Sequence, residues 1–99
     1  MNNSTSSSVV VLDAPITRGD QRIEQVELRK PDAGTLRGIK LVDLLQLDVV
    51  ALRTLLPRVS VPALTTSDVD RLDPVDLVSL GTEVLGFFMS RQERESLPA

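Results

Sequence analysis

A run of four carboxylates late in the chain comes closest to a pattern with chemical meaning. An EF-hand calcium loop needs glycine at its sixth position and a bidentate glutamate at its twelfth. Counted from Asp68, those positions hold Asp73 and Ser79, so the calcium pattern fails. We expect instead that Asp73 caps a helix and that the other carboxylates lie in solvent. The four members of the run are Asp68, Asp70, Asp73 and Asp76.

Catalytic and metal-binding patterns fail elsewhere too. The 99 residues include no histidine and no cysteine, which removes the commonest general base and the commonest zinc ligands. A nucleophilic serine would need a base such as Lys30 or Lys40, and no Ser-x-x-Lys spacing occurs. Gly34 and Gly38 bracket a loop that lacks the further glycines and the Lys-Ser or Lys-Thr of a phosphate site. We therefore predict a non-enzymatic protein without a metal or cofactor.

The charge of the chain also argues against nucleic-acid binding. There are 11 basic and 14 acidic residues, for a formal net charge of −3. Nucleic-acid binders usually carry a basic patch, and here the nearest cluster is Arg29, Lys30 and Arg37. No apolar run approaches the roughly 18 residues that span a bilayer, and no signal peptide is evident. A cytoplasmic protein is expected.

The first third of the sequence predicts a β-hairpin. Polar residues 1–8 are expected to form a disordered tail. Two strand segments, 9–17 and 22–29, flank a turn in which Gly19 can take a positive φ. Ile23 is out of phase with Val26 in the second strand, and a bulge between them is one explanation.

The remainder predicts three or four short helices packed on one face of the hairpin. The fold class is α+β, with a single domain over 9–91 and a flexible tail over 92–99. The expected helical signals are a turn at 32–36, a helix over 41–47, a helix capped by Asp48 that ends or kinks at Pro57, a connector at 61–64, a turn capped by Thr66 or Ser67, and a helix from Asp73-Pro74 to about Arg91.

The last helix is more apolar than a surface helix requires. Its apolar side chains cover an arc of roughly 200°, whereas a stripe of about 100° suffices to dock one face. Gly81 lies near the middle of this arc, where a neighbour could pack closely. Either the helix is central to the core, or part of the arc is offered to another protein. On the second interpretation the contact residues are Leu77, Leu80, Val84, Phe87 and Phe88.

Three segments in order resemble a known family. The first reads LRKPDAGTLRG over residues 28–38, and the second reads LLPR over residues 55–58. The third, D-x-x-x-L-D-P-x-D-L over residues 68–77, precedes the paired Phe87 and Phe88. Together they resemble the tail assembly chaperones (the protein E type) of Mu-like and related contractile-tailed bacteriophages.

The resemblance implies a phage or prophage protein that assists tail assembly in the host cytoplasm. Such proteins bind the tape measure protein, help recruit tail tube subunits, and are absent from the mature virion. Many are made in two forms by a translational frameshift, so a longer form of this chain is a possible partner besides the tail tube protein. The oligomeric state is left open by the sequence, and a homo-oligomer is one alternative. Arg29, Lys30 and Arg37 could then pair with acidic residues of the client.

Two other functions remain open on the sequence. A small regulator, such as an antitoxin or a repressor cofactor, would need a basic recognition helix or a toxin-binding tail, and no predicted helix is basic. A minor structural component of the virion would stay in purified particles.

Overall fold

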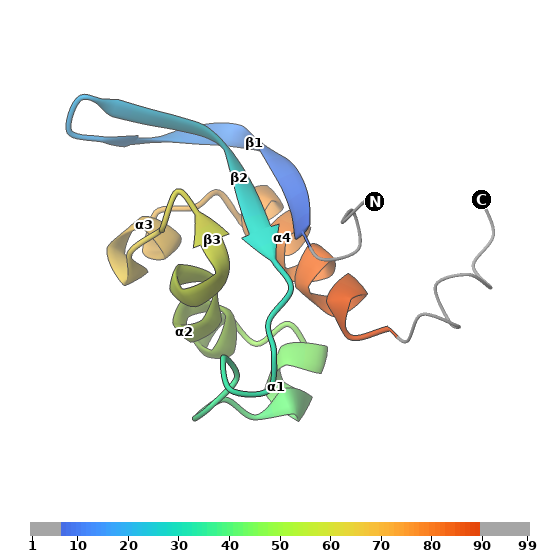
Figure 1. Cartoon of the computed structure of the whole chain (residues 1–99). Coiled ribbons are helices and arrows are strands. Elements are labelled where there is room, and N and C mark those ends of the chain that lie inside the picture. Colours follow the sequence, from blue (N-terminus) through green and yellow to red (C-terminus); the bar gives the residue numbers. More distant parts are fainter. Residues whose placement is uncertain (1–6, 90–99) are drawn as a thin grey trace, which may run out of the picture.

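The chain folds as a long β-hairpin with helices gathered beneath it (Figure 1). The structure, a computed structural model, describes residues 7–89. This arrangement confirms the predicted α+β class, with a hairpin followed by four helices. The elements in chain order are β1 (Ser7–Arg18), β2 (Gln21–Arg29), α1 (Leu41–Leu45), α2 (Val49–Val59), β3 (Ser60–Val61), α3 (Thr66–Asp70) and α4 (Pro74–Phe87).

The first strand begins earlier than expected. Ser7 and Ser8, which were predicted to be disordered, open β1 and pair with Arg29 and Leu28 of β2. Main-chain pairing and the burial of the next apolar residues outweigh the low hydrophobicity of the two serines. The rest of the predicted tail, residues 1–6, and the C-terminal tail lie outside the described residues.

The sheet has the strand order β1-β2-β3 and is antiparallel throughout. Its register shifts between two points: Val11 pairs with Gln25, and Ile16 pairs with Ile23. In β2 the irregularity lies between Ile23 and Gln25, within the stretch from Ile23 to Val26 where a bulge was predicted. The extra residues, however, belong to β1. The two-residue strand β3, which the sequence did not predict, pairs with Glu27 and Leu28 at the end of β2.

Side-chain caps fix where three helices begin. Asp48 accepts a hydrogen bond from the Ala51 amide at the start of α2, and Asp73 accepts one from the Val75 amide at the start of α4. Both caps were predicted. The cap of α3 is Thr65, not Thr66 or Ser67. Thr65 and Asp68 form a capping box, in which each side chain accepts a hydrogen bond from the other's amide.

Two helix ends differ from the predictions. Of the two predicted outcomes at Pro57, an end or a kink, the end does not occur: helix α2 continues to Val59, which is buried, and the Ser60 amide donates to the Leu56 carbonyl. Core packing of the last turn thus outweighs the missing proline donor. Helix α4 ends at Phe87 rather than near Arg91, because the amide of Phe88 turns back to the Leu85 carbonyl in a tightened last turn.

The hydrophobic core lies between the sheet and the helices. Strands β1 and β2 contribute inward-facing side chains such as Leu12 and Val26, and α2 and α4 contribute the opposite wall. Its fully buried large apolar side chains are Val26, Leu28, Leu44, Leu52, Leu55, Leu56, Leu64, Leu80 and Val84. A core of leucine and valine follows from a chain that has only two aromatic residues.

Gly81 allows α4 to approach the other helices closely, as its position in the apolar arc predicted. A Cβ atom at this position would lie 2.8 Å from Leu47 Cδ2 and 3.1 Å from Leu52 Cδ1. Leu52 is a buried residue of α2, and Leu47 follows α1 with a φ of 57°. The glycine is therefore required by packing and not by the backbone conformation of α4.

We predict that Gly81→Val lowers the free energy of unfolding by about 2 kcal/mol, because the added methyl groups overpack the contact with Leu47 and Leu52. Urea denaturation followed by circular dichroism measures the change. Thr82→Val is the matched control, since Thr82 is exposed on the same helix and the change conserves volume. Equal stability of the two variants would contradict the packing argument.

Candidate protein-binding surfaces

Exposed apolar side chains gather in two regions of the fold. The first region is α1 together with the first turn of α2, which we call the α1 surface. Each of its five large apolar side chains is between 53% and 68% exposed, although all of them fall within ten consecutive residues. A helix pair normally turns such residues inward, so this surface is available to another polypeptide. Its members are Leu41, Val42, Leu45, Val49 and Val50.

A basic segment leads directly into the α1 surface. Arg29, Lys30 and Arg37, which were predicted to contact a client, are all exposed, and so is Lys40 beside α1. The one carboxylate between them, Asp32, accepts hydrogen bonds from the amide and hydroxyl of Thr35. The segment therefore presents mainly positive charge next to exposed apolar side chains.

Arg58 of α2 holds this basic segment in place. Its guanidinium Nη1 donates to the carbonyls of Thr35 and Arg37, at 2.8 Å in both cases. The amide and hydroxyl of Thr35 lower the pKa of Asp32, so its carboxylate stays charged while it caps the turn. The loop before α1 thus has a defined shape, with Arg37 at its surface.

The second region combines β1 with the outer side of α4, and we call it the lateral surface. Val9 and Val11 of β1 are 56% and 72% exposed, and Val75 and Val78 of α4 are 57% and 56% exposed. A groove between the two elements is lined by Val9, Val10, Val78, Ser79, Thr82 and Glu83. The groove thus connects the start of β1, at Val9 and Val10, with Val78 of α4.

The sequence prediction for α4 needs a correction. Leu80, Val84 and Phe87, which were predicted to contact a partner, are buried in the core at 0%, 0% and 4% exposure. They lie on the side of α4 that faces the sheet and α2, so their apolar area is already covered by the chain itself. Leu77 and Phe88 pack against this core but remain partly exposed.

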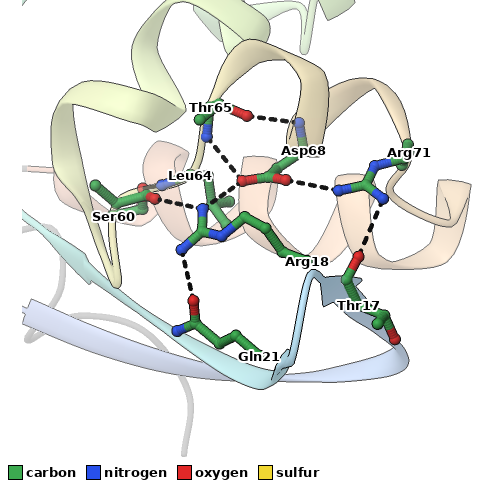
Figure 2. A network of polar contacts seen from close by, with 9 residues as sticks. Thr17, Arg18, Gln21, Ser60, Leu64, Thr65, Asp68 and Arg71 are labelled. Carbon is green, nitrogen blue, oxygen red and sulfur yellow. Dashed lines mark hydrogen bonds and ion pairs between the residues drawn. The ribbon is translucent and has the colours of Figure 1, made fainter.

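A buried carboxylate connects the tip of the hairpin to the helices. The side chain of Asp68 in α3 is 2% exposed and accepts hydrogen bonds from two arginines (Figure 2). Arg18, at the end of β1, donates from 2.6 Å, and Arg71 donates from 2.8 Å. The Arg71 guanidinium also donates to the Thr17 carbonyl, and the Thr65 amide donates to Asp68. The network joins β1, α3 and the segment that follows it.

These contacts determine the ionisation of Asp68. Burial raises the pKa of the carboxyl group, but hydrogen bonds from Thr65, Arg71 and Arg18 outweigh it and lower the pKa from 3.8 to about 2. The carboxylate is therefore charged at neutral pH, and each of its oxygens has a partner. Its role is to anchor the hairpin, since its ligand positions are filled by the protein.

A second buried carboxylate anchors the irregular part of β1. Asp76 in the first turn of α4 is 1% exposed. Its two oxygens accept hydrogen bonds from the amides of Asp13 and Ala14, at 2.6 and 2.9 Å. Where the register with β2 is interrupted, α4 thus supplies the acceptors that a neighbouring strand would otherwise supply.

The expectation that the carboxylates other than Asp73 lie in solvent was therefore wrong for Asp68 and Asp76. It holds for Asp70, whose exposed side chain pairs with Arg53. The Thr-x-x-Asp spacing from Thr65 to Asp68 was a signal of the capping box. The contacts with Arg18 and with the β1 amides span 50 to 63 residues, and no local pattern indicates them.

Neither a metal site nor a membrane span is found in the part of the chain that the structure describes. No group of three histidine, cysteine, aspartate or glutamate residues within 7–89 could hold a metal ion. None of the helices in this range is long and apolar enough to cross a bilayer.

Comparison with known proteins identifies the family. Residues 9–89 match the family model described as "Phage tail assembly chaperone proteins, E, or 41 or 14". The chain is 49% identical over 80 residues to tail assembly protein E of Escherichia phage P2, which covers 81% of this chain and 88% of that protein. It is 44% identical over 91 residues to tail assembly protein E' of the same phage, which covers 92% of this chain.

The chain therefore belongs to the phage tail assembly chaperone family, as its sequence motifs suggested. It spans 64% of the length of tail assembly protein E'. No solved structure matches it.

We predict that Asp68→Asn lowers the free energy of unfolding by about 2 kcal/mol at pH 7, because two charge-assisted hydrogen bonds lose their carboxylate acceptor. The folded-state pKa lies below its ordinary value, so the contribution of Asp68 is complete above about pH 4 and is lost as the pH falls toward 2. The difference between wild type and variant should shrink over that window. Urea denaturation at a series of pH values measures it.

Asp70→Asn is the control, since its pair with Arg53 is about half exposed on both sides and should contribute little. A constant difference between wild type and Asp68→Asn from pH 7 to pH 2 would contradict the assigned ionisation.

Proposed function

We propose that this chain binds the tape measure protein through the α1 surface and keeps it soluble until the tail tube assembles around it. Membership of the tail assembly chaperone family supports an assembly role. The observation that carries the proposal is the cluster of five large apolar side chains, each more than half exposed, beside a basic segment. The chain acts without catalysis, in the cytoplasm of the bacterial host, and is absent from the finished virion.

The chemistry of the α1 surface defines the client segment. Apolar side chains at Leu41 and Leu45, four residues apart on one helix, suit the apolar stripe of an amphipathic helix. Arg29, Lys30, Arg37 and Lys40 suit acidic residues along the border of that stripe. We infer that the client segment is helical, with an apolar stripe and an acidic flank.

The strength of the contact fits a temporary role. Covering the exposed half of a leucine or valine side chain contributes about 1 kcal/mol, and association costs at least about 4 kcal/mol. Five such side chains and a few screened ion pairs therefore give weak binding per copy. Such a contact releases when tube subunits compete for the tape measure protein.

Two partly exposed residues of α4 extend the proposal. Leu77 and Phe88 lie close to the helix face of Gly81, which contacts Leu47 directly after α1. They are the members of the predicted α4 contact set that remain partly exposed. The longer form of this chain and the tail tube protein are further partners on this proposal.

We predict that co-expression with the tape measure protein increases the soluble fraction of that client and that tagged chain retains it in a pull-down. Leu45→Lys and Val50→Lys should each reduce the retained client by at least about tenfold, because a charge is placed in the apolar contact. Reversing Arg29, Lys30 and Arg37 to glutamate should weaken retention most at low salt.

Val75→Lys, an equally exposed valine on the lateral surface, is the matched control and should retain the client. If the client is equally soluble with and without the chain, the proposed function is wrong. If Val75→Lys abolishes retention and Val50→Lys does not, the client binds the other surface.

A further inference from the structure

The lateral surface has a second apolar stripe on α4 that the core does not use. Val75, Val78, Thr82 and Leu85 recur at alternating intervals of three and four residues and fall within about 80° of one another on the helix. Val75, Val78 and Thr82 are exposed, whereas the core stripe lies on the opposite side of α4. Spacing of this kind is typical of helices that pack lengthwise against another helix.

The free edge of β1 runs beside this stripe. Within residues 7–89, β1 pairs only with β2, so it is the outer strand of the sheet. The amides of Asp13 and Ala14 already donate hydrogen bonds to Asp76, so they are not available to pair with another strand. The stretch Ser7–Val11 remains, and α4 is tied to it through the hydrogen bond from Ser8 Oγ to Glu83.

An open strand edge above an apolar helix stripe is a template for another chain. We propose that the lateral surface pairs with the lateral surface of a second copy of this protein. A two-fold axis perpendicular to the sheet would place Ser7–Val11 of both copies antiparallel, joining two sheets of three strands into one. The same axis would bring the outer stripes of the two α4 helices together beneath the joined strands.

The charge distribution favours a second copy over a client. No ionisable side chain occurs from Ser7 to Leu12. The only ionisable residues of helix α4 are Asp76 and Glu83. Asp76 is buried and accepts hydrogen bonds from β1 amides, and Glu83 accepts a hydrogen bond from the Ser8 hydroxyl. The lateral surface is therefore nearly uncharged where the two copies would meet, so two copies do not repel each other. The α1 surface, by contrast, is not uncharged, because it has a basic flank.

The size of the contact sets the expected affinity. Helix α4 has 14 residues and is about 21 Å long. Its outer stripe and five residues of strand edge correspond to an interface near the lower limit for specific complexes, about 1,200 Å² in total. We therefore infer a reversible dimer with a dissociation constant on the order of 10 micromolar. The inference is independent of tape measure binding.

Sedimentation equilibrium of the full chain between about 1 and 500 micromolar tests the proposal. The apparent mass should rise toward twice the mass of the chain, which is 10.8 kDa. Val78→Lys and Val9→Lys should each raise the dissociation constant by at least about tenfold, because lysine interrupts the stripe or the strand edge. Val50→Lys on the α1 surface is the matched control and should dimerise like wild type.

A cysteine scan gives a second measurement that does not depend on disruptive variants. The chain has no cysteine, so single substitutions at Ser8, Val9 and Val11 report directly on strand pairing. Under mild oxidation, the position closest to the axis should form a disulfide-linked dimer fastest, and Val50→Cys should not. A chain that stays monomeric to about 500 micromolar, or equal crosslinking at Val9 and Val50, would overturn the proposal.

Discussion

The structure depends on two buried carboxylates that fasten β1 to the helices. The hairpin is long for the body that it covers, and a two-stranded ribbon has marginal stability by itself. Asp76 accepts hydrogen bonds from two β1 amides where the register between β1 and β2 is interrupted. Asp68 forms ion pairs with Arg18, close to the turn of the hairpin, and with Arg71. Both aspartates lie in the first turn of a helix, where the helix dipole favours a negative charge.

This anchoring determines which surfaces remain for other proteins. With β1 tied to α4 at Asp76 and at Glu83, the core stripe of α4 is closed beneath the sheet. The opposite side of α4 and the start of β1 then form the lateral surface. The short helix α1 contributes only Leu44 to the fully buried core, so its other apolar side chains stay outside. On the two proposals made above, the α1 surface takes the client and the lateral surface takes a second copy, so the two contacts would not compete.

The interpretation of the last helix as a core helix holds for Leu80, Val84 and Phe87, whereas contact of its exposed side with another protein stays a prediction. Its apolar arc was too wide for one contact, and the structure divides it into a buried stripe that includes Leu80 and Val84 and an exposed stripe that includes Val75 and Val78. Periodicity alone cannot decide which stripe faces inward, since both consist of residues of similar hydrophobicity. The position of β1 decides it, through contacts more than 60 residues apart in the chain.

The hairpin, the caps at Asp48 and Asp73, the close approach at Gly81 and the family could all be predicted from the sequence. These depend on local spacing or on short motifs, so a window of a few residues contains the information. The burial of Asp68 and Asp76, the continuation of α2 past Pro57 and the place of Phe87 in the core became evident from the folded chain. Each of these results from a balance between a local cost, such as desolvation or a lost backbone hydrogen bond, and contacts supplied by distant segments.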